Sequence, residues 1–296
     1  MTSATLPAEA GSLRTSTETD MQTIKKVLNS SVVLVEDERG VERVVLGKGI
    51  GFGQKPGAPV QADAVDQVFV SLPDADQRNL VELLAQIPAE FVDITRSIVA
   101  DATANGLELD PHVYLTLTDH LNFAVERQRR GMKIVNRLVW EVKTVYPAQY
   151  AVGMRAVDTL RERLGVELPD EEAANIAFHL VNAAVGKAGV DSMQVVQLIS
   201  RIAQIVSHTG AAQLSRDDLH TSRFVAHLQY FAERFFDGKL STSDDDFLFT
   251  TLSERYPKAV DSAERVRSFV QKEYEVALPN EEVAYLALHI ARNSPE

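Results

Sequence analysis

Four of the seven histidines in this chain occupy matching places in two copies of one sequence pattern. His120 returns 107 residues later as His227, and His179 returns 110 residues later as His289. Packing alone favours apolar side chains at such positions, whereas a histidine nitrogen can carry a proton, a metal ion or a phosphoryl group near neutral pH. The repetition therefore makes chemistry the leading hypothesis, and a fold can bring the two histidines of each copy together.

Each histidine pair has three possible uses. A neutral imidazole, with an unperturbed pKa of about 6.5, is a competent nucleophile toward a phosphohistidine on another protein, and the product adds roughly two negative charges. The same histidines could instead be structural residues, with their ring nitrogens hydrogen-bonded inside the helix cores. A metal site is the weakest option, because the chain has no HExxH motif and no closely spaced set of His and Asp ligands. Reversible phosphorylation is the leading interpretation.

The other three histidines, His112, His208 and His220, have no counterpart in the other copy. We expect them to be surface or structural residues.

The helices that must position the histidine pairs are signalled in both copies. Residues 168–172 (LPDEE) precede an apolar run and predict a helix start, and residues 278–282 (LPNEE) repeat the signal. His179 and His289 thus lie about two turns into matching helices. A further helix is predicted after Asp110-Pro111 as far as Arg130. Its expected buried stripe consists of Leu115, Leu117, Leu121, Phe123, Ala124 and Arg127.

The region before the repeats has the sequence pattern of β-strands instead of helices. Residues 32–35, a polar turn and residues 41–46 predict an antiparallel hairpin, and shorter β signals follow at residues 51–52 and 68–70. A sheet module of this size buries little surface, which favours pairing with a second copy. Residues 1–20 are rich in Ser, Thr, Ala and Glu and are predicted to form a flexible tail.

Residues 47–53 contain four glycines but fit neither the GxGxxG nor the GxxxxGK[ST] phosphate-binding pattern. They favour a tight bend or a close approach to a ligand. Residues 21–60 carry six basic and four acidic side chains. This excess is modest for nucleic acid, but a symmetric dimer would double it.

The composition excludes several classes of protein. The net charge of −12 is spread along all 296 residues, which disfavours a bulk electrostatic nucleic-acid binder. The absence of cysteine removes disulfides, thiol catalysis and Cys-ligated zinc. No apolar run reaches the roughly 18 residues that a membrane span requires, and the N-terminus has no apolar signal segment. We expect a soluble cytoplasmic protein with no membrane insertion, no metal and no cofactor.

Over residues 21–296 the arrangement resembles the BglG/SacY family of transcriptional antiterminators. The resemblance rests on four strings that are specific in combination and in order: IKKVLNSSVV at 24–33, GKGIGF at 47–52, LTDHLNFA at 117–124 and RFVAHL at 223–228. It implies a small dimeric β module that binds a hairpin in nascent mRNA, under the control of two helical phosphotransferase-system (PTS) regulation domains. The hairpin excludes an overlapping terminator, so that RNA polymerase reads through a sugar-utilisation operon.

The resemblance also assigns roles to residues. It implies RNA contacts at Lys26, Asn29, Ser31, Gly47, Lys48 and Phe52. Ser30 and Ser31 stand where family members commonly have Asn or His followed by Asn, and Lys48 stands where Arg is frequent.

It further implies that the four repeated histidines accept phosphoryl groups. His120 and His179 would receive them from a sugar permease component, which inhibits. His227 and His289 would receive them from the histidine phosphocarrier protein, which activates.

The predicted fold is therefore multidomain, with a small antiparallel β-sheet RNA-binding module followed by two duplicated all-α helical-bundle domains. The expected boundaries are a tail at 1–20, the RNA-binding domain at 21–76, and PTS regulation domains at 77–186 and 187–296. We predict a homodimeric antiterminator that is not an enzyme. One alternative is a phospho-regulated protein whose first module binds DNA or protein, although no helix-turn-helix signal precedes residue 77. The other is an enzyme that uses the paired histidines with a metal.

Overall fold

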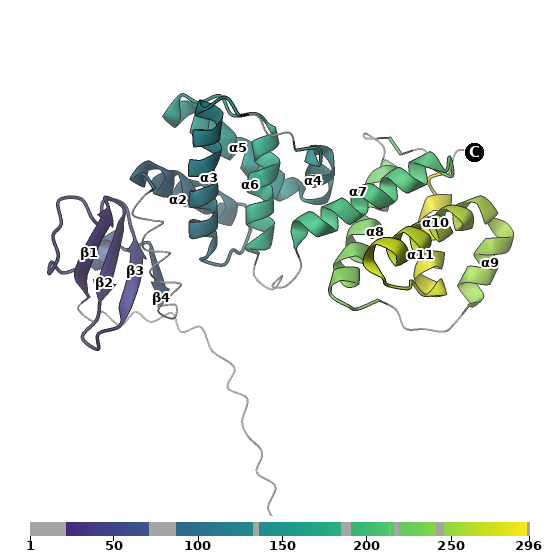
Figure 1. Ribbon diagram of the computed structural model, residues 1–296, viewed down its shortest axis with the longest axis horizontal. Helices are drawn as coiled ribbons and strands as arrows, with labels where there is room; N and C mark the ends of the chain where they lie inside the picture. The colour runs from purple at the N-terminus through teal and green to yellow at the C-terminus, as the bar shows by residue number, and fades with distance from the viewer. Residues whose placement is uncertain are drawn as a thin grey trace, which may run out of the picture. The chain divides into compact units, whose positions relative to one another are not determined.

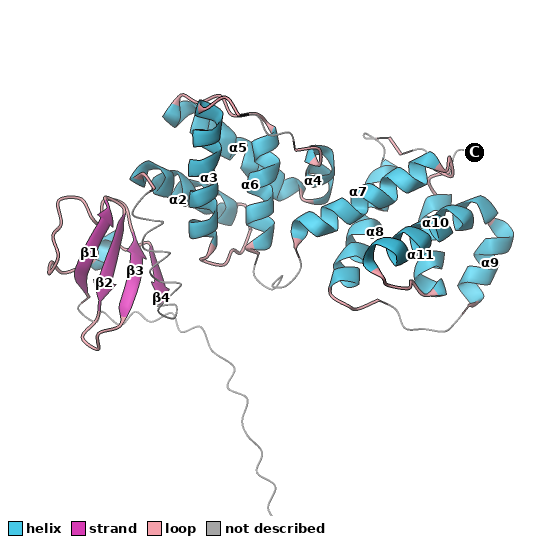
Figure 2. Cartoon of the chain, viewed as in Figure 1, coloured by secondary structure: helices cyan, strands magenta, loops and turns pink. Residues whose placement is uncertain are grey.

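The computed structural model describes residues 22–70, 87–132, 136–184, 191–212, 214–215, 219–240 and 246–294. The chain divides into two compact units, of which the first ends at Ala89 and the second begins at Glu90. A sheet makes up the first unit and helices make up the second (Figures 1 and 2), which confirms the predicted fold class. The expected tail at 1–20 lies outside the described residues.

The first unit contains a four-stranded antiparallel sheet in the order β1-β2-β3-β4. Its elements are β1 (Thr23–Asn29), β2 (Val32–Glu36), β3 (Glu42–Leu46), a short 3-10 helix η1 (Ala62–Ala64) and β4 (Gln67–Val70). The predicted hairpin is confirmed as β2 and β3, with Val33 opposite Val45. Its turn is held by Asp37, whose Oδ1 accepts the backbone N–H groups of Arg39 and Val41 at 2.9 Å.

Strand β1 is the element that the β-branched pattern did not signal. Two consecutive lysines interrupt its alternation, and the register shifts between Ile24 and Lys26, which is a β-bulge. Ile24 nevertheless packs into the small core of this unit. That core consists of Ile24, Val33, Val35, Val45 and Ile50.

The β signal at residues 51–52 is wrong, because these residues form a turn. The N–H of Gly51 donates to the carbonyl of Ser30 at 3.0 Å, so the chain folds back across the end of the first hairpin. A Cβ on Gly51 would lie 2.2 Å from the carbonyl oxygen of Asn29. Only glycine permits this approach, and its presence explains a turn where an apolar dipeptide favoured a strand.

Apart from an isolated bridge between Leu109 and Ala184, the regular secondary structure in the described part of the second unit is helical. Its helices are α2 (Ala89–Ala104), α3 (Val113–Arg129), α4 (Val139–Val145), α5 (Pro147–Leu164), α6 (Glu171–Asn182), α7 (Ser192–His208), α8 (Leu219–Phe236), α9 (Phe247–Arg255), α10 (Pro257–Tyr274) and α11 (Asn280–Ala291). Both predicted helix starts are confirmed, since α6 and α11 begin just after the two Leu-Pro dipeptides. Pro147 and Pro257 open α5 and α10, where the missing N–H costs no hydrogen bond.

The buried stripe predicted for α3 is confirmed except at one residue. Leu117, Leu121 and Ala124 are buried, but Phe123 is 55% exposed. Phe123 follows Leu121 by two positions, which is about 200° around a helix, so it points away from the buried face. An exposed aromatic side chain therefore lies close in sequence to His120.

The apolar core of the second unit is continuous across the two sequence repeats. Residues of α4 and α6 from the first repeat join residues of α7 to α11 in one cluster of buried side chains. This shared packing fixes the helices of the second repeat against the end of the first. Within the described residues, no helix combines the length and the hydropathy needed to cross a bilayer.

Candidate functional site

The fold brings the repeated histidines together in pairs. His120 on α3 lies against His179 on α6, with ring centroids 4.6 Å apart. His227 on α8 stacks on His289 on α11, with centroids 3.6 Å apart and planes inclined by 25°. Residues about sixty positions apart in sequence thus form two equivalent imidazole pairs.

An arginine–glutamate ion pair accompanies each histidine pair, and its residues are not among the predicted site residues. Arg127 binds Glu172 in the first repeat. In the second, Nη2 of Arg234 lies 3.0 and 2.7 Å from the two carboxylate oxygens of Glu282. Both glutamates are buried, with 3% and 2% exposure.

The spacing of these residues explains why the two contacts occur together. The arginine follows the first histidine by seven residues, and the glutamate precedes the second histidine by seven. Seven residues are about two helical turns, so an antiparallel pair of helices places His opposite His at one level and Arg opposite Glu at another. This matched spacing, present in both copies, was the available sequence signal.

In the first repeat the ion pair and the histidine pair are joined directly. Nε2 of His120 is buried and lies 3.2 Å from Oε2 of Glu172, which also accepts a hydrogen bond from Nδ2 of Asn175 at 3.0 Å. Burial opposes ionisation of Glu172, but the close contact with His120, the hydrogen bond from Asn175 and the charge of Arg127 outweigh it and lower its pKa. Glu172 is therefore a carboxylate that orients His120.

The second histidine of each pair is held neutral. Burial, followed by the neighbouring His120, lowers the pKa of His179 from 6.5 to about 4. Burial, followed by His227 and Arg292, lowers the pKa of His289 from 6.5 to about 4. A neutral imidazole has a lone pair available on one ring nitrogen, so these side chains are suited to accept a phosphoryl group at neutral pH.

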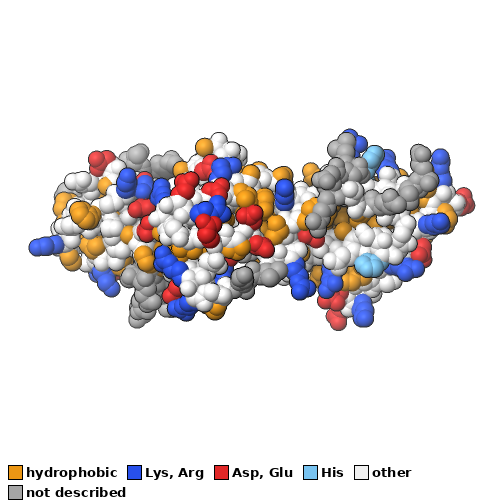
Figure 3. Space-filling view, turned by 90° about the horizontal axis from the view of Figure 1, so that it is seen from above, with side chains coloured by type: hydrophobic (Ala, Val, Ile, Leu, Met, Phe, Trp, Pro, Cys, Tyr) orange, Lys and Arg blue, Asp and Glu red, His pale blue; other side chains and the backbone are white. Residues whose placement is uncertain are grey.

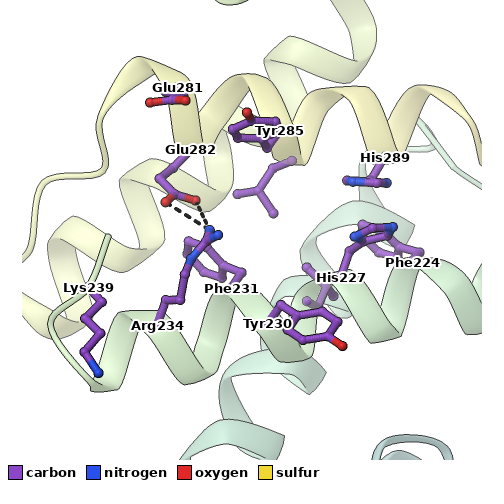
Figure 4. A pocket seen from close by; sticks show the side chains of 12 residues that line it. Phe224, His227, Tyr230, Phe231, Arg234, Lys239, Glu281, Glu282, Tyr285 and His289 are labelled. Atoms are coloured by element: carbon purple, nitrogen blue, oxygen red, sulfur yellow. Dashed lines mark hydrogen bonds and ion pairs between the residues drawn. The ribbon is translucent and has the colours of Figure 1, made fainter. Parts of the chain in front are cut away.

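The second pair opens into a pocket of about 540 Å³. Figure 4 shows the stacked His227 and His289 at one end, the Arg234–Glu282 pair at the other, and two tyrosines between them. His227 is exposed, whereas His120 is largely enclosed. The second pair is thus open to a large donor molecule.

The remaining histidines lie apart from these pairs. Nδ1 of His112 lies 2.9 Å from Oδ1 of Asp110 at the surface, and Nδ1 of His208 lies 2.7 Å from the carbonyl oxygen of Gln204. His220 is exposed on α8. Among the described residues, no three or more His, Asp or Glu side chains are grouped closely enough to hold a metal ion.

The residues with predicted RNA roles lie on β1, in the turn after it and in the loop at 47–53, and they differ in exposure. Lys26, Lys48 and Phe52 are exposed, and Phe52 reaches 79%. Asn29 is partly buried, and its Oδ1 accepts the N–H of Ser31 at 2.9 Å. Ser31 is itself buried. Lys26, Lys48 and Phe52 are thus accessible at the surface, whereas Asn29 and Ser31 stabilise the backbone turn after β1.

Gly47 has a backbone role of its own. Its N–H donates to the carbonyl of Ser31 at 3.0 Å, and a Cβ there would lie 1.7 Å from the carbonyl oxygen of Ala64. The glycine lets the loop at 47–53 pass tightly between the strand end and η1. This loop carries Lys48 and Phe52.

The charges of the molecule do not separate into large fields on the face shown in Figure 3, where acidic and basic side chains are interspersed. This face therefore carries no broad basic surface that could bind a polyanion by charge alone.

Comparison with known proteins gives matches over most of the chain. The family model described as "CAT RNA binding domain" matches residues 22–78, and the model described as "PRD domain" matches residues 100–183 and 200–293. The transcription antiterminator LicT of Bacillus subtilis (strain 168) is 35% identical over 91% of this chain and 98% of its own. The beta-glucoside operon antiterminator of Dickeya chrysanthemi is 37% identical over 91% of this chain and 95% of its own.

One solved structure is also similar. The crystal structure of GlcT CAT-PRDI is 31% identical, with a TM-score of 0.50, and covers 56% of this chain and 99% of that chain.

Proposed function

Because this chain belongs to the family of transcriptional antiterminators that join a CAT RNA binding domain to two PRD domains, we propose that it stabilises an mRNA hairpin and prevents termination in a sugar-utilisation operon. The observation that carries the proposal is the exposure of Lys26, Lys48 and Phe52, which all lie within the match to the RNA-binding family.

The chemistry of this group suits a folded RNA. An exposed phenylalanine can stack on an unpaired base, and base–aromatic stacking is worth about 1–3 kcal/mol. Lysines hold phosphates without reading sequence, and an amide such as that of the partly buried Asn29 suits the 2′-hydroxyls and minor-groove edges of RNA. The buried Ser31 contributes through the backbone turn that it forms with Asn29. The chain then acts by binding and turns over no substrate.

Control is proposed to lie in the two histidine pairs. His120 and His179 accept phosphoryl groups from a sugar permease component, and His227 and His289 accept them from the histidine phosphocarrier protein. Their placement in two regulation domains, at 77–186 and 187–296, lets one cytoplasmic protein compare two signals. The small core of the first unit supports a homodimer as the RNA-binding form.

The RNA-binding group is tested by alanine substitution. The probe is an RNA hairpin from the leader upstream of a neighbouring sugar-permease gene, and affinity is measured by gel shift with the full chain. We expect Lys26→Ala and Phe52→Ala to weaken binding about tenfold or more, because each removes a contact to phosphate or base.

The matched controls are Lys258→Ala and Phe247→Ala, which remove equally exposed side chains from the helical unit. These should leave RNA affinity unchanged, and all four variants should keep the wild-type helical circular dichroism. Unchanged RNA affinity in both Lys26→Ala and Phe52→Ala would contradict the antiterminator proposal. Binding of a duplex DNA in preference to the hairpin would favour the alternative of a DNA-binding regulator.

A further inference from the structure

The pocket in the second repeat contains a cation as well as the histidine pair. Arg234 lines the same cavity of about 540 Å³ as His227 and His289. Side chains on a helix lean toward its N-terminus, so Arg234 leans along α8 toward His227, and His289 leans along α11 toward Glu282. The His227–His289 contact and the Arg234–Glu282 contact are about 10.5 Å apart along the helices. The side chains of Arg234 and His289 both lean into the space between these contacts (Figure 4).

The charges of the pocket are balanced before any modification. Its lining includes Arg234, Lys239, Glu281 and Glu282. A phosphoryl group would add roughly −1.5 to −2 and would need a cation. Lys239 binds Asp237 at 2.5 Å and lies at the far end from the histidines in Figure 4. Of these two lining cations Arg234 is the nearer, and its planar guanidinium suits phosphate oxygens. Arg292 lies close enough to His289 to lower its pKa, but it does not line the pocket.

The exposure of the ion pair shows which partner can move. Glu282 is buried, whereas the Arg234 side chain is 47% exposed. In the first repeat the equivalent Arg127 is only 8% exposed and its guanidinium carbon lies 5.2 Å from the Phe123 ring centroid. The same pair is thus enclosed in one repeat and open in the other.

We propose that Arg234 is the phosphate-binding residue of the second repeat, which exchanges one oxygen of Glu282 for a phosphoryl group carried by His227 or His289. This inference rests on the proposed phosphorylation of these histidines. Arg234 acts after transfer, as a positioning residue that binds the modified imidazole and draws α8 and α11 together. In the first repeat, a phosphoryl group on His120 would instead meet the carboxylate of Glu172.

The test uses potassium phosphoramidate, which modifies histidines without a donor protein. The P–N bond of phosphoramidate breaks as a P–N bond to the imidazole forms, and the departing amine leaves as ammonium with the imidazole N–H proton. The readout is the ³¹P NMR titration of phosphohistidine in the full chain. Signals missing from His227→Ala/His289→Ala identify the second pair.

Four variants separate a phosphate contact from a structural effect. Arg234→Gln/Glu282→Gln removes both charges and leaves no lone buried carboxylate, so it should fold. Glu282→Gln is its reference, because the two then differ only at Arg234, whose side chain is 47% exposed. Arg234→Lys keeps the positive charge, and Arg265→Gln removes an exposed arginine of α10 as a control.

We expect the titration midpoint of the second-pair phosphohistidine to be about one pH unit higher in Arg234→Gln/Glu282→Gln than in Glu282→Gln, because a guanidinium favours the phosphoryl dianion. Arg234→Lys should keep most of the wild-type midpoint, and Arg265→Gln should match the wild type. Equal midpoints in Glu282→Gln and the double variant would overturn the role of Arg234. Absence of any second-pair signal in the wild type would instead count against the proposed phosphorylation itself.

Discussion

His179 and His289 carry the clearest electrostatic signature in the molecule. Each is folded as a neutral imidazole because burial, and then the partner histidine beside it, lowers its pKa to about 4. An unfolded histidine titrates near 6.5. The folded state therefore binds fewer protons than the unfolded state between these two values. Stability should be complete above the unfolded pKa and should fall as the pH drops toward the folded pKa.

The prediction is a loss of thermal stability between pH 7.5 and pH 5 that depends on these two residues. The unfolding midpoint of the wild type should decrease over this range, and the decrease should be smaller in His179→Gln/His289→Gln. Glu172 contributes little here, because a carboxyl with a lowered pKa loses its stabilising charge only as the pH falls below its unfolded value of 4.5.

His208→Gln is the matched control, because His208 is an exposed histidine at the end of α7. It should show the same decrease as the wild type. An equal decrease in the double variant and the wild type would show that the neutral histidines do not set the acid sensitivity.

Residue types and spacing predicted the four histidines but not their charged partners. Arg127 and Glu172 are separated by 45 residues, and Arg234 and Glu282 by 48. Each contact depends on the antiparallel packing of two helices, which no local pattern specifies. The common spacing of seven residues in both repeats would have indicated it once that packing was assumed.

At the scale of elements, one glycine sets the distance between two helices of the first repeat. Gly153 on α5 faces α6, and a Cβ there would lie 2.3 Å from the carbonyl oxygen of Ala173. Helix α6 carries both Glu172 and His179, so its position determines the geometry of the histidine pair. The equivalent position in the second repeat is Ala263, which is fully buried. The close contact between α5 and α6 therefore requires glycine at position 153.

Gly153→Ala should therefore destabilise the helical unit by about 2 kcal/mol. Alanine gains up to about 1 kcal/mol of helix propensity, but the clash with a backbone carbonyl forces α5 and α6 apart, and overpacking costs about 1–3 kcal/mol or more. Urea unfolding monitored by circular dichroism measures the change. Arg163→Ala, on the exposed surface of the same helix, should be near neutral. If Gly153→Ala unfolded at the same urea concentration as the wild type, the proposed steric limit at this contact would be wrong.

Elements with strong local signals were predictable, and those shaped by distant contacts were not. The Leu-Pro dipeptides and the acidic residues after them placed the starts of α6 and α11 correctly, because proline and early acidic residues favour a helix N-terminus directly. Strand β1 was hidden by Lys25 and Lys26, whose bulge is stabilised by pairing with β2. Phe123 was assigned to the wrong face because apolar character alone does not give the phase of a helix.

At the scale of the whole molecule, the chain combines one RNA-binding unit with two sensors of the same design. The two sensors share a continuous core, so a change in the packing of either histidine pair can affect the other. Regulation then requires a coupling free energy between a histidine pair and the RNA-binding unit, which for allosteric proteins is commonly 1–3 kcal/mol. Such a coupling corresponds to a change of roughly tenfold in RNA affinity.

The most direct test measures the affinity of the full chain for the leader hairpin before and after incubation with phosphorylated histidine phosphocarrier protein. The wild type should bind the hairpin roughly tenfold more tightly after phosphorylation, with label on His227 or His289 by mass spectrometry. His227→Ala/His289→Ala should bind at its unmodified affinity throughout. Equal hairpin affinity in the modified and unmodified wild type, or an equal response in the double variant, would contradict control of RNA binding by the paired histidines.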